Sequence, residues 1–346
     1  MMPPPPACAA PLVFITGASS GIGQALAMRF YQAGWRLALV ARRVQAVHDW
    51  AAQHGIAASR YTAYQADVRA TDALVAACHT CMARQGVPDV VLACAGISHG
   101  INTAEREDLD VMADIYATNC TGLAATFHPF IAPMQARRSG KLVGMASVAG
   151  IRGLPGHGAY CSSKAAVISY CESLRGELRD CGVQVITLLP GYIDTPMTAH
   201  DTHTRHFLLT AEQFADRAWR AIQANASYCV IPWQMAIVAK ILRLLPNWAF
   251  DRIMHGTNPA RTRRPVAETG SDRLRQQKRQ CADAAPCKAR RTGSGMRAGR
   301  MVCACTHPTR MVASASNSPS RPPRRACWTN TTHALPTCCN PAVMVS

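Results

Sequence analysis

Short strand-like runs alternate with longer segments of helical period along the first 250 residues. The runs are Leu12–Ile15, Arg36–Val40, Tyr61–Gln65, Val90–Cys94, Lys141–Met145, Val183–Leu189 and Tyr228–Ile231. In the first helical segment Ile22, Leu26 and Phe30 recur at helical spacing, and Gly34 follows as a C-cap. Strands that alternate with helices are typical of a doubly wound α/β fold. We therefore expect a parallel sheet in a single Rossmann-like domain over residues 10–250.

An apolar stretch from Trp233 to Phe250 follows the last of these strands. Three residues interrupt it: Lys240, Arg243 and Pro246. Amphipathic helices most often bury their apolar face in protein, which favours a helix over 233–250 that caps the core or contacts another subunit. A helix that lies on a membrane surface, flanked by Trp233 and Trp248, also stays open.

The composition changes abruptly after Gly256. Residues 1–256 hold 21 basic and 17 acidic residues, whereas residues 257–346 hold 16 basic and 3 acidic ones, so most of the net charge of +17 lies in the last segment. That segment has almost no apolar periodicity, and we expect a disordered basic tail outside the fold. Translation past a stop codon or in another frame would give similar residue usage. For the folded part we expect no nucleic-acid partner.

The chain has sixteen cysteines without the spacing of a metal site. Nine of them precede Gly256, within helical and strand patterns, where we expect reduced thiols that pack as small apolar side chains. No two C-x-x-C motifs are present, so we expect no metal. The sequence shows no signal-peptide pattern and no apolar run of membrane-spanning length. We expect a cytoplasmic protein, with peripheral membrane contact through 233–250 left open.

Glycines follow the first strand in the segment Thr16–Gly23, with the spacing G-x-x-x-G-x-G. Glycine lets a backbone turn sharply and approach a diphosphate, whose charge is favoured by the free N–H groups at a helix start. We expect cofactor contacts from Gly17, Ser19, Ser20, Gly21, Ile22 and Gly23. A turn that needs three glycines for structural reasons alone would have the same sequence.

Two arginines, Arg42 and Arg43, follow the second strand. An acidic residue near this position holds the adenosine ribose in dehydrogenases that use NAD, and none is present here. Guanidinium groups are planar, permanently charged donors that suit a 2′-phosphate, so the pair predicts NADP (NADPH) as the cofactor. The alternative is that one or both arginines lie in solvent, as charged residues commonly do.

Tyr160 and Lys164 lie four residues apart in a predicted helix, which places both side chains on one face. A phenol with a pKa near 10 is a poor acid or base at neutral pH, but a nearby ammonium stabilises its phenolate. Tyr160 can then exchange a proton with a substrate oxygen while hydride moves at a nicotinamide. Ser147, shortly after the fifth strand, can donate to the same oxygen. Each residue alone has an ordinary structural interpretation, and their joint placement favours catalysis.

Together these motifs resemble the short-chain dehydrogenase/reductase family over about residues 10–250. The resemblance implies that Tyr160 and Lys164 carry the acid–base chemistry and bind the ribose, and that Ser147 orients the carbonyl. Asn119 matches by motif an asparagine that completes a proton relay through water in this family. A buried asparagine that bonds backbone groups is the structural alternative.

The same resemblance implies further cofactor contacts. These are an adenine contact from Asp67 and Val68, a border to the cofactor from Ala95 and Gly96, and contacts beside the nicotinamide from Pro190, Gly191, Ile193 and Thr195. One departure concerns the family's N-A-G segment, which reads Cys94-Ala95-Gly96 in this chain. A thiol is a much weaker hydrogen-bonding group than an amide, so we expect reduced local stability or cofactor affinity there.

We therefore expect an NADP(H)-dependent oxidoreductase that interconverts a small-molecule carbonyl and an alcohol by hydride transfer, with Tyr160 as general acid or base. We expect it to form a homodimer or homotetramer. The alternative is a non-catalytic nucleotide-binding or scaffolding protein whose cationic tail binds acidic partners. The complete set of Ser147, Tyr160, Lys164 and Asn119 argues against that alternative.

Overall fold

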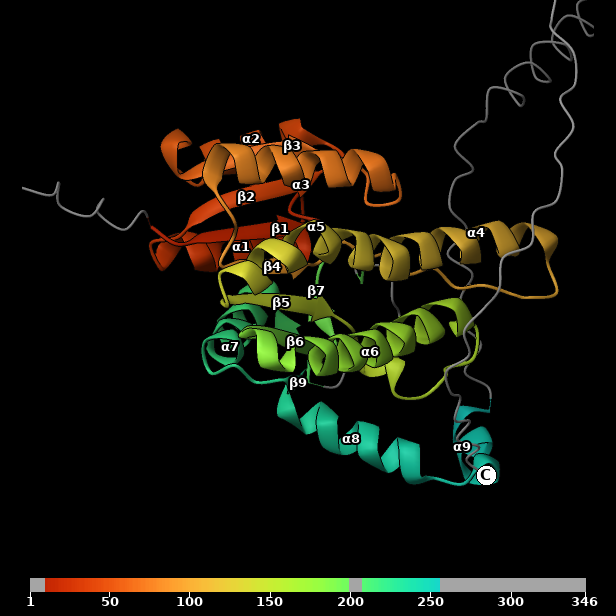
Figure 1. Cartoon of the computed structure of the whole chain (residues 1–346). Coiled ribbons are helices and arrows are strands. Elements are labelled where there is room, and N and C mark those ends of the chain that lie inside the picture. Colours follow the sequence, from red (N-terminus) through yellow and green to blue (C-terminus); the bar gives the residue numbers. More distant parts are fainter. Residues whose placement is uncertain (1–9, 199–206, 256–346) are drawn as a thin grey trace, which may run out of the picture. The chain divides into compact units, whose positions relative to one another are not determined.

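A parallel β-sheet forms the centre of the computed structural model, which describes residues 10–198 and 207–255 (Figure 1). Its strands are β1 (Leu12–Thr16), β2 (Arg36–Ala41), β3 (Tyr61–Gln65), β4 (Val90–Ala93), β5 (Gly140–Met145), β6 (Val183–Pro190) and β9 (Tyr228–Ile231). Within these described residues the sheet has seven strands in the order β3-β2-β1-β4-β5-β6-β9, and all neighbouring pairs are parallel. The predicted doubly wound α/β fold is confirmed.

Helices connect the strands and cover both faces of the sheet. They are α1 (Gly21–Gln32), α2 (Val44–Gln53), α3 (Thr71–Gln85), α4 (Arg106–Tyr116), α5 (Gly122–Ala136), α6 (Gly158–Leu178), α7 (Ala211–Gln223), α8 (Trp233–Leu244) and α9 (Asn247–Met254). α1, α2 and α7 pack on one face, and α3, α5 and α6 pack on the other. Two short strands, β7 (Ile193–Asp194) and β8 (Leu209–Thr210), pair outside the main sheet.

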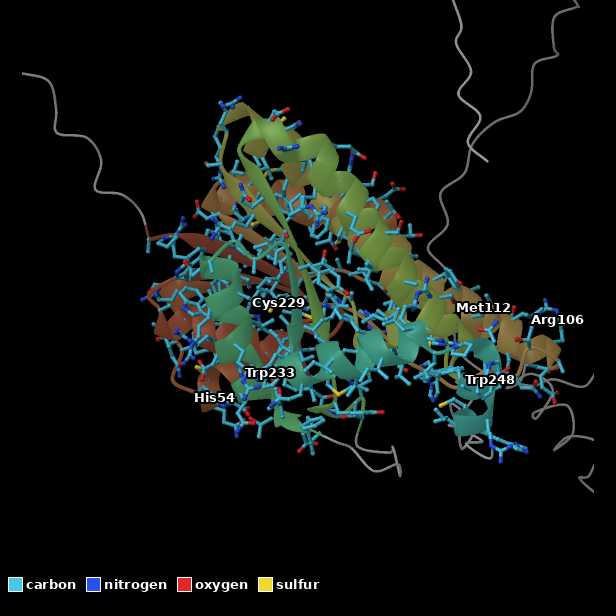
Figure 2. All side chains as sticks on the ribbon, turned by 90° about the horizontal axis from the view of Figure 1, so that it is seen from below. His54, Arg106, Met112, Cys229, Trp233 and Trp248 are labelled. Carbon is cyan, nitrogen blue, oxygen red and sulfur yellow. The ribbon has the colours of Figure 1, made fainter. Side chains whose placement is uncertain are left out.

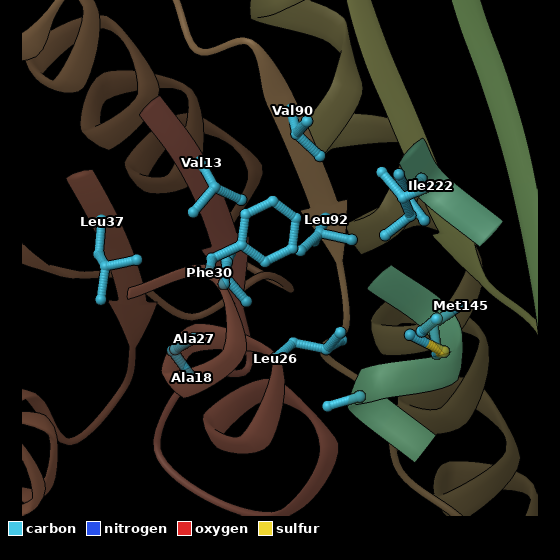
Figure 3. Close-up of a cluster of buried hydrophobic side chains, with 14 of the residues drawn as sticks. Val13, Ala18, Leu26, Ala27, Phe30, Leu37, Val90, Leu92, Met145 and Ile222 are labelled. Carbon is cyan, nitrogen blue, oxygen red and sulfur yellow. The ribbon is translucent and has the colours of Figure 1, made fainter. Parts of the chain in front are cut away.

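Successive side chains of the central strands enter two separate cores. Val13 of β1 packs with Phe30 of α1 in the first core, as Figure 3 shows. Phe14, the next residue, belongs to the opposite core, where its ring centre lies 4.8 Å from that of Phe130. Burial on both faces explains why the central strands are continuous apolar runs and do not alternate with polar residues.

The apolar stretch 233–250 forms two helices, and the expectation of one helix was wrong. α8 ends at Leu244, and α9 begins at Asn247. Pro246 has no backbone N–H for a helical hydrogen bond and disfavours the helical conformation in the residue before it. Leu245 accordingly has an extended backbone, with φ −61° and ψ 133°. Figure 1 shows α9 turned away from the axis of α8.

The predicted basic tail, 257–346, lies outside the described residues. Of the helices that the structure does describe, none is long and apolar enough to cross a membrane. Eight cysteines lie within 10–198 and 207–255, and all are free thiols. Cys78, Cys81, Cys161 and Cys171 are buried, as expected for cysteines that pack as small apolar side chains.

Candidate active site

An open cavity lies at the carboxyl ends of β1 and β4, where the strand order reverses. Ligands of open parallel sheets bind at such a switch point. The predicted site residues that line the cavity are Gly17, Ser19, Ser20, Gly21, Ile22, Gly23, Arg42, Asp67, Val68, Ala95, Gly96, Ser147, Tyr160, Lys164, Pro190, Gly191, Ile193 and Thr195. Arg43 and Asn119 are not among the lining residues. The fold thus places nearly all of the predicted site residues around one cavity.

The glycine turn between β1 and α1 forms one wall of this cavity. Gly17 has a φ of +71°, and a Cβ atom there would lie 2.8 Å from the backbone of Ala95. At Gly23 a Cβ atom would lie 2.3 Å from the carbonyl oxygen of Gly17. The side chain of Ser20, the N-cap of α1, makes no capping hydrogen bond. The turn itself therefore requires glycine, and the start of α1 offers backbone N–H groups to an anion.

Charged side chains gather near the ends of β2 and β3. Arg69 donates to both carboxylate oxygens of Asp67 at 2.8 to 3.2 Å, and it pairs with Asp114 at 3.0 Å. The hydrogen bonds from Arg69 lower the pKa of Asp67, and the charge of Arg42 adds to this effect. Arg42 is exposed and lines the cavity, whereas Arg43 is the N-cap of α2 and does not. Asp67 is therefore ionised at neutral pH, Arg69 is neutralised by two carboxylates, and Arg42 adds a positive charge to this end of the cavity.

Tyr160 and Lys164 lie on α6 and line the cavity together. The Nζ atom of Lys164 lies 5.8 Å from the centre of the Tyr160 ring. Ser147, in the loop after β5, lines the same cavity and is 7% exposed. Its Oγ accepts a hydrogen bond from the backbone N–H of Ala149 at 3.2 Å. Because this bond uses a lone pair, the hydroxyl hydrogen remains for another acceptor.

Lys164 is almost completely buried, with 5% of the residue exposed. Its ammonium group donates to the backbone carbonyl of Met145 at 2.9 Å. Loss of hydration disfavours the charged form and lowers the pKa of Lys164 to about 8. The lysine is therefore mostly protonated at pH 7, and it keeps its charge at a cost in free energy.

Asn119 lies in a π-helical turn, Ala117–Thr121, between α4 and α5, and it is 1% exposed. Its amide nitrogen donates to the carbonyl of Ile97 at 3.0 Å and to Oγ of Ser163 at 2.9 Å. Its amide oxygen accepts from the N–H of Ile97 at 2.9 Å. Ser163 in turn donates to the carbonyl of Tyr160 at 2.8 Å. The asparagine therefore joins the loop after β4 to the first turns of α6.

Comparison with known proteins identifies the family. A family model described as short chain dehydrogenase matches residues 11–206. An uncharacterized oxidoreductase of Myxococcus xanthus is 35% identical over 240 residues, which cover 68% of this chain and 93% of that protein. The chain belongs to the short-chain dehydrogenase family. The resemblance seen in the sequence is confirmed, and the protein belongs to a family of oxidoreductases.

Solved structures share the fold of this short-chain dehydrogenase. A short-chain dehydrogenase/reductase from Burkholderia phymatum, in complex with NAD, aligns with a TM-score of 0.62 at 21% identity, over 72% of this chain and 98% of that one. An alcohol dehydrogenase from Thermococcus sibiricus, complexed with 5-hydroxy-NADP, aligns with a TM-score of 0.57 at 24% identity, over 64% and 96%. At these identities the likeness establishes the fold, so the chemistry of this chain rests on its own side chains.

The segment after β6 forms another wall of the cavity in this short-chain dehydrogenase. Oγ1 of Thr198 donates to the carbonyl of Ile193 at 2.6 Å and accepts from the N–H of Thr195 at 3.2 Å. Gly191 has no room for a side chain, because a Cβ atom there would lie 2.9 Å from Cγ of Met235. Since Met235 belongs to α8, that helix packs directly behind the cavity wall.

Cys94, the first residue of the Cys94-Ala95-Gly96 segment, lies just after β4. Burial raises the pKa of its thiol to about 12, so the thiol stays protonated at neutral pH. One link joins the loop after β4 to the end of β1, because the N–H of Ala95 donates to Oγ1 of Thr16 at 3.4 Å. A hydrogen bond of this length is weak. The expected loss of local stability or cofactor affinity stays a prediction.

Sequence reasoning missed Arg69, Ser163 and Thr198. Each stands beside a motif that was recognised: Arg69 follows the Asp67–Val68 pair, Ser163 lies between Tyr160 and Lys164, and Thr198 follows Thr195. The two-residue step from Asp67 to Arg69 was a usable signal, because a long side chain can fold back onto a carboxylate at that spacing. The bond between Asn119 and Ser163 joins residues 44 positions apart and had no such signal.

Proposed function

We propose that this protein is an NADP(H)-dependent oxidoreductase that interconverts a carbonyl and an alcohol, with Tyr160 as its proton-transfer residue. The observation that carries the proposal is that Tyr160, Lys164 and Ser147 line one cavity together with the glycine turn. A hydroxyl donor, a phenol and a cation are the groups needed to hold a substrate oxygen and to exchange a proton with it.

The cavity residues fit a nicotinamide dinucleotide. Gly17 and Gly21 keep one wall free of side chains, and the start of α1 offers N–H groups that would hold the diphosphate. Arg42 is the residue that would bind a 2′-phosphate, which favours NADP over NAD. When bound, the dinucleotide supplies or accepts the hydride.

The protein's own side chains hold the substrate oxygen and move one proton. Ser147, whose Oγ already accepts from Ala149, donates its hydroxyl hydrogen to the carbonyl oxygen. Tyr160 gives its phenolic proton to the same oxygen during reduction and takes it back during oxidation. The Lys164 ammonium, 5.8 Å from the ring centre, stabilises the phenolate that remains.

Asn119 acts behind these groups as a positioning residue. Both hydrogens of its amide are used, one by Ile97 and one by Ser163, and one lone pair of its oxygen is used by the N–H of Ile97. An amide oxygen has two lone pairs. The second one is suited to a water molecule, which agrees with a proton relay that runs past Lys164.

Replacement of the phenol tests the proposal. Wild-type protein should oxidise NADPH with members of a panel of aldehydes and ketones, and Tyr160→Phe should lower kcat at least about 10²-fold because the proton donor is lost. NADPH binding, measured by fluorescence titration, should survive. Tyr116→Phe is the matched control, because this phenol on α4 donates to Ser162 at 2.6 Å and does not line the cavity.

Turnover that survives Tyr160→Phe would contradict the role given to this residue. NADPH binding by the wild type without turnover of any carbonyl would favour the non-catalytic nucleotide-binding alternative.

A further inference from the structure

An apolar stripe runs along α8 and α9 on the side away from the sheet. It consists of Trp233, Ile237, Ile241, Leu244, Trp248 and Ile253, each with between 51% and 84% of its surface exposed. Figure 2 shows Trp233 and Trp248 toward opposite ends of this helix pair. Met235 and Ala239, on the other face of α8, are buried. Contiguous exposed apolar patches of this kind mark interaction surfaces.

The α8–α9 stripe is held against the body by Arg152, from the loop that follows Ser147. The guanidinium group of Arg152 donates to the carbonyls of Leu242 and Leu245, the latter at 2.7 Å. It also lies 4.0 Å from the centre of the Phe250 ring. These contacts satisfy carbonyls at the end of α8 and orient α9. The two helices therefore present the stripe as one fixed surface.

Basic residues accompany the stripe, and acidic ones are scarce. Over the span of the stripe, Trp233 to Ile253, the sequence holds three basic residues, Lys240, Arg243 and Arg252, and one acidic residue, Asp251. Lys240 and Arg243 are exposed near the middle of the stripe, and Arg243 also donates to the carbonyl of Ile151 at 3.3 Å. Apolar side chains flanked by long basic ones are typical of helices that lie in the headgroup region of anionic membranes. Tryptophans prefer the same region.

A second copy of this chain suits the stripe less well. In a two-fold contact, residues near the centre of the patch meet their own equivalents in the partner. Lys240 and Arg243 would then face the same cations of the other copy, with no carboxylate on α8 to pair them. Charges that are buried without a partner are costly. The stripe of a second copy would bring one carboxylate, Asp251, whereas a surface of anionic lipid headgroups supplies many negative charges.

We propose that the α8–α9 stripe docks on the surface of an anionic lipid membrane. Its apolar side chains enter the boundary between headgroups and acyl chains, while Lys240 and Arg243 contact the headgroups. Because Met235 packs against Gly191, the docked α8 lies directly behind a wall of the cavity.

Vesicle flotation of the full chain tests this proposal. Wild type should co-float with phosphatidylcholine vesicles that contain phosphatidylserine, and far less with phosphatidylcholine alone. Ile241→Asn/Leu244→Asn should weaken binding at least about tenfold, because two apolar side chains no longer enter the lipid. Leu109→Asn/Leu208→Asn, which changes two exposed leucines elsewhere, is the matched control and should bind like wild type. Lys240→Gln should weaken binding to the anionic vesicles about fivefold and leave binding to phosphatidylcholine vesicles unchanged.

A second readout does not depend on loss of binding. Brominated lipid should quench the fluorescence of Trp233 and Trp248 in wild type. Trp233→Phe/Trp248→Phe should keep vesicle binding and lose most of this quenching. Circular dichroism and the thermal midpoint should show that each variant is folded.

Full vesicle binding by Ile241→Asn/Leu244→Asn would overturn the proposal and assign the binding to the basic segment after Gly256, which all variants retain. Failure of the wild type to bind either vesicle would overturn it as well. If light scattering then shows a dimer that the same double substitution dissociates, the stripe is a contact between copies of the chain.

Discussion

Lys164 carries a positive charge in surroundings that disfavour it. Burial lowers its pKa from 10.5 to about 8. Between these two values the unfolded chain binds a proton that the folded protein has lost, so stability rises with pH across this window. Below about pH 8 the folded protein keeps the charge, and the lost hydration of the buried ammonium group lowers its stability. Lys164, which serves the proposed chemistry, therefore lowers the free energy of unfolding at neutral pH.

Lys164→Met should stabilise the protein and remove its activity. At pH 7 the substitution deletes a buried charge, and we expect the free energy of unfolding to rise by about 1–3 kcal/mol. At pH 10, where the native lysine is already neutral, the gain should shrink to about a quarter of its value at pH 7. Urea unfolding at both pH values measures this. Lys240→Met, at an exposed lysine, should change stability by less than about 0.5 kcal/mol. An equal gain at pH 7 and pH 10 would contradict the explanation.

Arg42 and Arg43 are neighbours in sequence, yet only Arg42 lines the cavity. Arg42→Ala should raise the Kd for NADPH about 10- to 100-fold, because a charged hydrogen-bond donor to the 2′-phosphate is lost. The Kd for NADH should change little, and Arg43→Ala should change neither. Fluorescence titration of each variant with NADPH and with NADH gives the four Kd values. If Arg42→Ala weakens the binding of NADPH and NADH equally, the contact with the 2′-phosphate is rejected. If Arg43→Ala weakens NADPH binding more than Arg42→Ala does, the contact is assigned to Arg43.

At the scale of elements, single side chains join helices that are distant in sequence. Asn119 links the π-helical turn before α5 to α6 through Ser163. Arg152 links the loop after Ser147 to the break between α8 and α9. Arg152 bonds backbone carbonyls, which any sequence offers, and Asn119 bonds a hydroxyl 44 positions away, so residue identities alone do not reveal either link.

Arg152→Ala should loosen the C-terminal helices. The change removes hydrogen bonds to the carbonyls of Leu242 and Leu245 and the contact with Phe250. We expect the free energy of unfolding to fall by about 1–2 kcal/mol, measured by urea unfolding, because Arg152 is only partly buried. Limited trypsin digestion should cleave faster after Arg243.

Arg106→Ala is the control for this prediction. Arg106 pairs with Asp110 at 3.1 Å, but both side chains are largely exposed, and such pairs contribute less than about 1 kcal/mol. If Arg152→Ala costs no more than Arg106→Ala, Arg152 does not hold the helices.

At the scale of the whole molecule, the two cores on either side of the sheet draw on α1, α2, α3, α5, α6 and α7. The last described helix ends at Met254. Residues 257–346 contribute no apolar pattern in the sequence that would extend either core. We propose that the folded domain ends near residue 256. A homodimer or homotetramer and a cytoplasmic location stay predictions.

Truncation after residue 256 should leave the thermal midpoint within about 2 °C of the full chain, because no core side chain is removed. NADPH binding should be unchanged, while retention on a cation exchanger should fall as the net charge drops from +17 to +4. Truncation after Pro246 is the contrasting variant. It removes Phe250, which is 7% exposed, and should lower the midpoint by several degrees. A large drop on truncation after residue 256 would place the basic segment within the fold.

The sequence by itself determined the layers of the fold and most of the site's lining. Continuous apolar strands between amphipathic helices are compatible with few arrangements, and the glycine turn and the Tyr160–Lys164 spacing depend on backbone geometry within a few residues. Only the tertiary structure decided that Arg42 lines the cavity and Arg43 does not, that Arg69 holds Asp67, and that α8 leaves an apolar stripe exposed. These outcomes depend on which surfaces meet when distant segments pack. Local residue patterns carry little information about such contacts.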